Sequence, residues 1–284
     1  MMQNILLAVS GLGHAEEMLK LMEEIPSIQR AKVTVLHVVP PQTIAETMTA
    51  KWEEGGSILA SAIQKLQLNP NQVNSVLRQG EPKDVVCQVA NEIDADLIIM
   101  GSRGLKRLQS ILANSVSQYV FQLSSRPMLL VKDDIYVKAI NRVMVAVDKS
   151  EASQYCLDLA LFLLKDIKGG ELILTHVITD LKSPSAETAQ VNADKHPILE
   201  AATNKAQRQG IKSRSILSIG KPGEKICSLA EEMNIDLLLV GSPDRRPTIA
   251  KNFVDLDKLL GTSLSDYVRI NATCPVLLAR TAVA

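Results

Sequence analysis

Short apolar runs alternate with segments of helical periodicity along the whole chain. In the first half of the chain, the apolar runs are Ile5–Val9, Val33–Val39, Val73–Leu77, Leu97–Met100 and Met128–Val131. Runs of this length that are rich in β-branched residues predict strands buried on both faces of a sheet. Between the runs, apolar residues recur at helical spacing, as at Met18 and Met22, and in the second half at Tyr155, Leu159 and Phe162. Strands that alternate with helices predict a parallel, doubly wound sheet with right-handed crossovers.

The second half of the chain repeats the first. Asn4–Ser10 matches the segment that begins 138 residues later, Gly80–Ser102 matches the one 140 residues later, and Ser115–Val120 matches the one 148 residues later. Matching landmarks at a growing offset indicate a duplicated domain. The growth from 140 to 148 places eight additional residues between Ser242 and Ser263 of the second copy.

The repeat also predicts where the domains begin and end. The two copies meet in the charged stretch from Lys132 to Lys138. We therefore expect a first domain over residues 1–134, a linker over 135–138 and a second domain over 139–284. A length of 284 residues, about twice that of a typical single domain, agrees with this division.

Composition excludes several classes of function. The 31 Lys and Arg residues balance the 31 Asp and Glu residues, so the chain has no net charge that would attract nucleic acid or an anionic membrane. No apolar run approaches the roughly 18 residues of a membrane span, and no basic residue precedes the apolar N-terminus as in an export signal. The four cysteines never form a CxxC pair, which favours free thiols in a reducing cytoplasm and gives no metal site.

The candidate chemistry lies where the first, second and fourth strands are predicted to end. Ligands of open parallel sheets bind outside the carboxyl ends of the strands, here at Ser10–Gly13, Val38 and Gly101–Gly104. Glycines let the backbone approach a phosphate, and Ser115 and Ser117 stand where the next helix begins, beside its unpaired N–H groups. A tight turn followed by a helix capped by Ser or Asn would give the same pattern, and spacing alone leaves both interpretations open.

At these motifs the chain resembles a tandem universal stress protein. The nucleotide-binding pattern of that family is Gly, two residues, Gly, nine residues, and then Gly before Ser or Thr. The first copy has Gly101, Gly104 and then Asn114-Ser115 at that spacing, with Asn in place of the third glycine. The resemblance covers nearly all 284 residues and implies two tandem five-stranded, Rossmann-like domains of the adenine-nucleotide alpha hydrolase-like type.

The resemblance also implies a function and a set of site residues. We expect binding of ATP or another adenine nucleotide, with or without Mg²⁺, by a sensor or regulator in the stress response. The implied site residues of the first copy are Ala8, Ser10, Val38, Gly101, Arg103, Gly104, Asn114, Ser115 and Val116. The corresponding, degenerate site of the second copy comprises Asp148, Val177, Gly241 and Ser263.

Neither copy carries the complete family pattern. ATP-binding members resemble one another in an Asp at the end of the first strand, where the first copy has Ser10 and the second keeps Asp148. Conversely, the second copy has Asp244 in place of the second glycine of the phosphate loop and a longer segment after it. Loss of a carboxylate weakens ligand binding at a site, whereas different and additional residues in the phosphate loop change the shape of the site. We therefore expect the first copy to be the nucleotide site.

Two other functional classes remain as alternatives. One is an interaction or scaffold protein that binds no nucleotide, in which the two domains pair through their last strands across a pseudo-two-fold axis, with or without homodimerisation of the whole chain. The other is an enzyme, because Ser10–Gly13 resembles the loop of ATP pyrophosphatases. That loop departs from the pattern at Leu12 and His14, and the chain has no GxSxG or HExxH motif, so we do not expect an enzyme. His37 and His176 occupy matched strand positions, which favours a hydrogen-bonded structural role for both.

Overall fold

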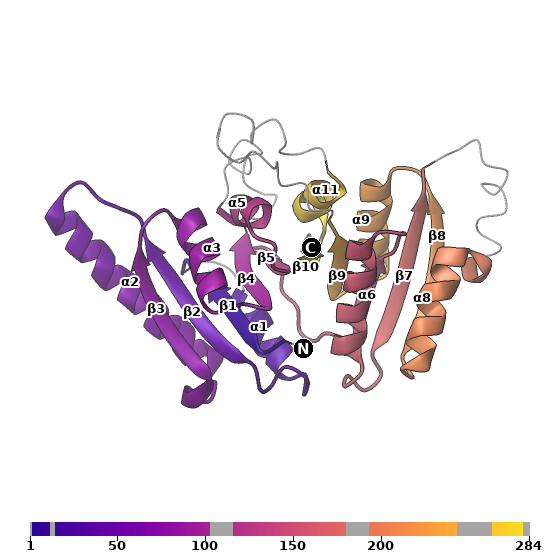
Figure 1. Cartoon of the computed structure of the whole chain (residues 1–284), viewed down its shortest axis with the longest axis horizontal. Coiled ribbons are helices and arrows are strands. Elements are labelled where there is room, and N and C mark those ends of the chain that lie inside the picture. The colour runs from indigo at the N-terminus through magenta and orange to yellow at the C-terminus, as the bar shows by residue number, and fades with distance from the viewer. Residues whose placement is uncertain (1, 12–14, 103–115, 180–192, 243–262, 281–284) are drawn as a thin grey trace. The chain divides into compact units, whose positions relative to one another are not determined.

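The computed structural model of the chain describes residues 2–11, 15–102, 116–179, 193–242 and 263–280. The chain divides into two compact units, Met1–Tyr136 and Val137–Ala284, drawn from indigo to magenta and from rose to yellow in Figure 1. Arg103, Gly104, Asn114 and Ser115 of the implied first site lie outside the described residues.

The first unit contains five parallel strands in the order β3-β2-β1-β4-β5. These are β1 (Asn4–Ala8), β2 (Lys32–Val39), β3 (Val73–Gln79), β4 (Leu97–Ser102) and β5 (Met128–Lys132). The central strands are buried because helices cover both faces, which is why the sequence shows them as unbroken apolar runs. Along the chain, β2 and β3 are added on one side of β1, whereas β4 and β5 are added on its other side. The strand order therefore reverses between β1 and β4, and a crevice forms between the carboxyl ends of these two strands.

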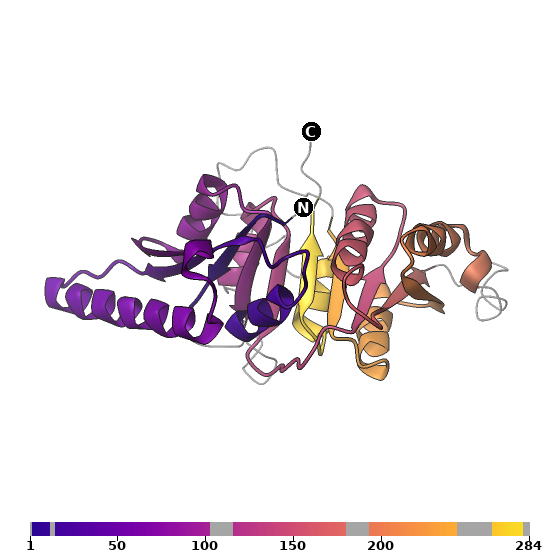
Figure 2. The same cartoon turned by 90° about the horizontal axis from the view of Figure 1, so that it is seen from below.

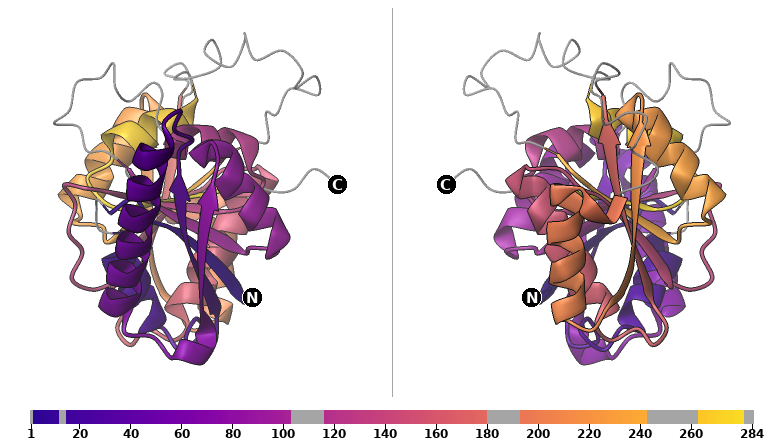
Figure 3. Two further views of the ribbon diagram at one scale, coloured as in Figure 1. Left: turned by 90° about the vertical axis from the view of Figure 1, so that its left-hand side faces the viewer. Right: turned by 90° about the vertical axis from the view of Figure 1, so that its right-hand side faces the viewer.

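The helices of the first unit cover the two faces of its sheet in pairs. They are α1 (Ala15–Glu23), α2 (Ala45–Leu66), α3 (Pro82–Glu92) and α5 (Val116–Leu123), with a 3₁₀ turn η1 (Pro70–Gln72) between α2 and β3. Figure 2 shows α1 and α2 on one face and α3 on the other, where α3 also contacts α5. The long helix α2 runs beside β2 and β3 (Figure 3, left).

The second unit has the same topology. Its parallel strands, in the order β10-β9-β6-β7-β8, are β6 (Arg142–Ala146), β7 (Glu171–Ile178), β8 (Lys212–Ile219), β9 (Leu237–Gly241) and β10 (Val276–Ala279). The helices are α6 (Glu151–Leu164), α8 (Pro197–Arg208), α9 (Pro222–Glu232) and α11 (Leu264–Asn271), and η2 (Ala193–Lys195) precedes α8. Helix α8 contacts β7 and β8 (Figure 3, right). The prediction of two tandem, doubly wound five-stranded sheets is therefore confirmed.

A repeated aspartate fixes the first strand of each unit. Asp96 Oδ2 accepts hydrogen bonds from the backbone N–H of Gln3, at 2.6 Å, and of Asn4, at 3.0 Å. Asp236 Oδ2 does the same for Asn141 and Arg142, both at 2.8 Å. Each carboxylate stands one residue before β4 or β9 and satisfies two amides at the start of β1 or β6. The repeated Asp-Leu motif is thus explained by strand alignment at the end of the sheet opposite the crevice.

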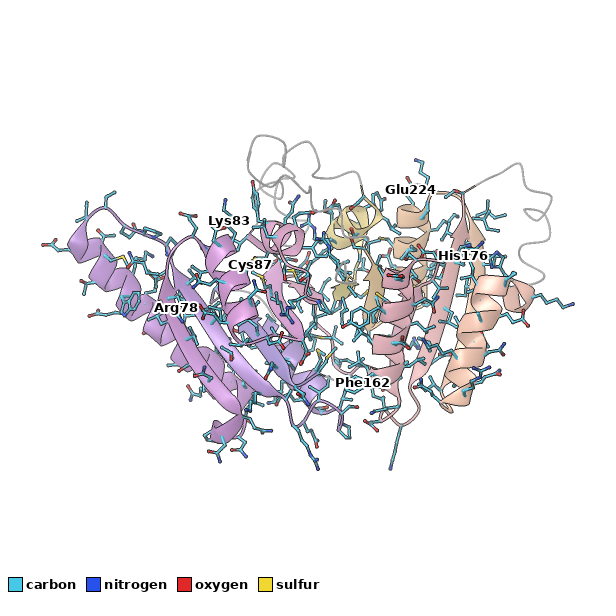
Figure 4. All side chains as sticks on the ribbon, in the orientation of Figure 1. Arg78, Lys83, Cys87, Phe162, His176 and Glu224 are labelled. Atoms are coloured by element: carbon cyan, nitrogen blue, oxygen red, sulfur yellow. The ribbon has the colours of Figure 1, made fainter. Side chains whose placement is uncertain are left out.

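The buried face of α6 differs from the predicted stripe. Tyr155 and Phe162 are only partly buried, and Figure 4 labels Phe162, whose ring contacts Lys165 Nζ at 4.7 Å from the centroid. Leu159 of the predicted stripe is buried, together with Ala152, Ser153, Cys156, Leu157, Ala160, Leu161, Leu163 and Leu164. The physical reason is close packing: a Cβ on Gly241 at the end of β9 would lie 2.6 Å from the backbone nitrogen of Ser153. At this close approach, in the first turn of α6, only small side chains such as those of Ala152 and Ser153 fit against the sheet.

Candidate functional site

A cavity of about 460 Å³ opens at the carboxyl ends of the strands of the first unit. This volume falls within the range of about 300–1,000 Å³ that is typical of small-molecule sites. The cavity is lined from three strand ends, the loop after β2, three helices and the residue after β5. The lining residues are Ala8, Val9, Ser10, Leu36, His37, Val38, Val39, Pro40, Gln42, Lys51, Glu54, Ile58, Pro82, Val86, Met100, Gly101, Ser102, Val116, Ser117 and Asp133.

The structure brings together the described residues of the implied first site. Ala8, Ser10, Val38, Gly101 and Val116 come from β1, β2, β4 and α5, and all five line this one cavity. They meet because parallel strands end at the same edge of the sheet and because α5 begins beside β4. The cavity therefore coincides with the crevice between β1 and β4.

Sequence analysis missed the contribution of α2 to this cavity. Lys51, Glu54 and Ile58 lie on α2 and line the cavity from the side of β2. No motif marks the segment, and its only local signal is the i,i+3 spacing of a cation and an anion at Lys51 and Glu54. Which side of the sheet a helix covers, and how far it extends past the strand end, depends on packing.

Two glycines allow α2 to lie close to the strand ends. Gly11, three residues after the end of β1, has φ of +78°, a left-handed conformation that costs little without a side chain, and a Cβ there would lie 3.3 Å from Ile58 Cδ1. A Cβ on Gly55 would lie 2.9 Å from His37 Cδ2 and 3.0 Å from Val39 Cγ2. The backbone of α2 therefore rests directly on the carboxyl end of β2.

A histidine in each unit joins the first two strands. His37 Nδ1 donates to the carbonyl oxygen of Val9 at 2.8 Å, and His176 Nδ1 donates to that of Val147 at 2.7 Å. A carbonyl oxygen can only accept, so Nδ1 of each ring carries a proton. The predicted hydrogen-bonded role of both histidines is confirmed, and His37 also lines the cavity.

A charged pair stands at the mouth of the cavity. Lys51 Nζ donates to Glu54 Oε2 at 2.6 Å, and both side chains are about half exposed, at 47% and 57%. The hydrogen bond from Lys51, together with its charge, lowers the pKa of Glu54 from its ordinary value of 4.5, so this carboxylate is ionised at neutral pH.

The end of β4 and the start of α5 form the opposite end of the cavity. Gly101 and Ser102 end β4, and the first turn of α5 follows with Val116 and Ser117. The first N–H groups of a helix have no partner within the helix and carry the positive end of its dipole. This end suits an anionic group.

The polar groups of the second unit are bonded to one another. Asp148 Oδ1 accepts from the backbone N–H of Ser150 at 2.8 Å, and Ser263 Oγ donates to Asp266 Oδ2 at 2.7 Å. Gly241 lies against the first turn of α6, and Val177, on β7, is partly buried. The four predicted residues of the second unit thus lie at the strand and helix ends that correspond to those of the first site. The Ser263 hydroxyl and the Asp148 carboxylate, however, already have hydrogen-bond partners within the unit.

In the second unit, two stacked histidine rings lie at the position where α2 lines the cavity of the first unit. The ring of His196, just before α8, stacks on that of His176 with centroids 4.7 Å apart; Figure 4 labels His176 on β7. Burial and the charges of His176 and Lys149 lower the pKa of His196, so its ring favours the neutral form. In the first unit, Gly55 and not a second ring lies against the corresponding histidine.

Comparison with known proteins identifies the family. The family model described as "Universal stress protein family" matches residues 1–132 and again residues 139–280. The chain belongs to the universal stress protein family. Its resemblance to that family, stated above from the sequence motifs, is confirmed.

Similar universal stress proteins match one half of the chain. Universal stress protein YxiE of Bacillus subtilis is 29% identical over 148 residues, which is 46% of this chain and 100% of that protein. A universal stress protein of Thermus aquaticus, named for its position in the QAH/OAS sulfhydrylase 3′ region, is 30% identical over 139 residues, again 46% of this chain and 100% of that protein. Relatives that correspond to one unit agree with a tandem arrangement.

A solved structure matches both halves. The crystal structure of a universal stress protein from Archaeoglobus fulgidus DSM 4304 covers 98% of this chain and 96% of its own, with a TM-score of 0.74 and 21% identity. At this identity the likeness establishes the fold. Within the described part of this universal stress protein, no helix is long and apolar enough to cross a membrane. The same residues contain no group of three or more His, Cys, Asp or Glu side chains arranged to hold a metal ion.

Proposed function

We propose that this universal stress protein binds an adenine nucleotide in the cavity of its first unit and acts as a nucleotide-dependent regulator. One observation supports this most directly. Five residues that the resemblance implies as site residues line a single cavity of about 460 Å³ at the point where the strand order reverses. The proposed activity is binding, and no catalytic step is assigned to it.

The two ends of the cavity suit the two ends of a nucleotide. Leu36 and Val38 give the β2 side of the cavity an apolar wall, and Pro82, Val86 and Met100 add apolar surface. An adenine ring gains from leaving water for such a wall. Gly101, Ser102 and the N-terminus of α5 form the other end, where backbone N–H groups and the helix dipole favour phosphate. Among the described lining residues, Glu54 and Asp133 carry carboxylates. Glu54 lies on the β2 side of the cavity, whereas Asp133 follows β5 beyond β4, so we do not propose that the two carboxylates bind Mg²⁺ together.

The proposal is confined to the first unit. In the second unit, Ser263 and Asp148 are engaged in capping α11 and in the turn before α6. Binding a phosphate there would require these bonds to break. The stacked ring of His196 also fills the space beside His176. These contacts are the reason why we do not extend the proposal to the second unit.

Titration calorimetry of the purified chain with ATP, ADP and AMP tests the proposal. We expect one of them to bind and to raise the melting temperature, because a ligand that binds only the folded state stabilises it. Extraction of the heat-denatured protein, followed by mass spectrometry, identifies any nucleotide that is retained through purification.

A matched pair of variants locates the site. Val38→Arg places a long side chain in the cavity, whereas Val177→Arg makes the same change at the corresponding position of the second unit. We expect Val38→Arg to weaken binding at least about tenfold and Val177→Arg to leave it unchanged, with circular dichroism to verify that both variants fold. Absence of binding by the unmodified chain, or equal loss in both variants, contradicts the proposal and favours the scaffold alternative.

A further inference from the structure

The cavity of the first unit contains a carboxylate whose position is set by helix packing. Glu54 precedes Gly55, whose missing side chain lets α2 rest on His37 and Val39. Packing of α2 thus places Glu54 beside the carboxyl end of β2, where it lines the cavity with its side chain still exposed to solvent. Lys51 holds Oε2 at 2.6 Å, and Oε1 has no hydrogen-bond partner among the residues that the structure describes. An ionised acceptor with open capacity thus faces the cavity.

Helix α2 approaches the end of β1 near this carboxylate, because a Cβ on Gly11 would lie 3.3 Å from Ile58, which stands one turn after Glu54. Across the cavity the order is α2 with β2, then β1, then β4 with α5. If the base occupies the apolar wall and the phosphate lies at Gly101 and α5, the ribose lies over the end of β1 at Ser10. Glu54 reaches this position from the side of β2. Ser10 is an uncharged group, so Glu54 supplies the negative charge on this side of the ribose.

We propose that Glu54 accepts hydrogen bonds from the 2′- and 3′-hydroxyls of the bound nucleotide and thereby selects nucleotides with a free ribose diol; this rests on the proposed function. A carboxylate has two acceptor oxygens, and hydrogen bonds to a charged acceptor are about twice as strong as neutral ones. A 2′-deoxy sugar or a 3′,5′-cyclic phosphate removes or blocks one of the two hydroxyl donors. Lys51 is a positioning residue that keeps the carboxylate turned toward the cavity.

The test compares ribose and deoxyribose nucleotides on the full-length chain. Calorimetry with ATP and 2′-deoxy-ATP gives the ratio of the two dissociation constants for the unmodified protein, Glu54→Gln and Glu53→Gln. Glu53 is the matched control, because it is the neighbouring exposed carboxylate on α2 and does not line the cavity. We expect the unmodified chain and Glu53→Gln to prefer ATP about tenfold, and Glu54→Gln to lose most of that preference.

The outcomes separate this inference from the function on which it rests. If the unmodified chain binds neither nucleotide, the proposed function is contradicted. If it binds both equally well, or if Glu54→Gln keeps the full preference for ATP, only the role of Glu54 is overturned. Glu54→Ala serves as a second variant, and a pH titration adds a readout: protonation of the carboxylate at low pH should erase the preference in the unmodified chain and change nothing in Glu54→Gln.

Discussion

At the scale of single residues, two adjacent glycines of α2 have opposite surroundings. A Cβ on Gly55 would lie 2.9 Å from His37 and 3.1 Å from Leu77, whereas a Cβ on Gly56 would meet no atom within 4 Å. Both glycines lower the intrinsic stability of the helix, since glycine loses more conformational freedom on folding than alanine does. Only Gly55 compensates for this by allowing close packing.

Substitution by alanine should therefore have opposite effects at the two positions. We expect Gly56→Ala to raise the free energy of unfolding by about 0.5–1 kcal/mol. Gly55→Ala should lower it by about 1–2 kcal/mol, because the clash with β2 outweighs the gain in helix propensity. Urea denaturation of the two variants measures both effects. Stabilisation by both substitutions would show that α2 does not rest on β2 in this way.

A half-buried carboxyl at the end of α1 makes stability depend on pH. Burial raises the pKa of Glu23 from its ordinary value of 4.5 to about 7. The folded chain thus holds a proton that the unfolded chain releases between these two pH values, so stability is expected to fall as pH rises from 4.5 to 7. The side chain keeps some contact with water, so we expect a loss of about 1 kcal/mol, below what the full shift implies.

Replacing this carboxyl should remove the dependence. Glu23→Gln should melt at a higher temperature than the unmodified chain at pH 8 and at nearly the same temperature at pH 4.5. The control is Glu24→Gln, a change at the exposed neighbour, which should keep the pH dependence. A Glu23→Gln variant whose melting temperature still falls across this range would rule out Glu23 as the cause.

At the scale of elements, the same device fixes the first strand in each unit. Asp96 and Asp236 each accept two backbone hydrogen bonds at the start of β1 or β6. Loss of either carboxylate leaves two amides without their partner, at a cost of about 1–3 kcal/mol. The sequence repeat showed that these aspartates correspond, and the structure gives the reason.

Each aspartate is the control for the other. In Asp96→Ala, hydrogen exchange should become faster in peptides that cover residues 2–8 and remain unchanged in those that cover 141–146. Asp236→Ala should show the reverse. Exchange that rises in both segments of either variant would mean that the two units do not behave as separate packing units at this edge.

At the scale of the whole molecule, duplication produced two like folds with unlike crevices. The first unit has a cavity with backbone donors and a carboxylate at its mouth, whereas the corresponding polar groups of the second unit are bonded to one another. Pairing of the two domains through their last strands, homodimerisation and a cytoplasmic location stay predictions. So does the assignment of nucleotide binding to one unit.

Binding stoichiometry tests that assignment. Native mass spectrometry with saturating nucleotide should show one nucleotide per chain, because in the second unit Asp148 and Ser263 are bonded within their own turns and His196 stacks on His176. Val38→Arg should lower the fraction of chains that carry a nucleotide, and Val177→Arg should leave that fraction unchanged. Two nucleotides per chain would show that the hydrogen bonds of Asp148 and Ser263 open readily and that the second unit is also a site.

The sequence by itself determined the duplication, the strands and the edge of the sheet at which a ligand would bind. Strands buried on both faces must be apolar, and parallel strands must end together, so the crevice and residues such as Ser10 and Gly101 could be predicted from local pattern. Only the tertiary structure decided that Glu54 faces the cavity, that α6 turns Phe162 outward and that Ser263 bonds to Asp266. These depend on how closely one backbone approaches another, and that distance is set by side chains far away in the sequence, such as His37 against Gly55.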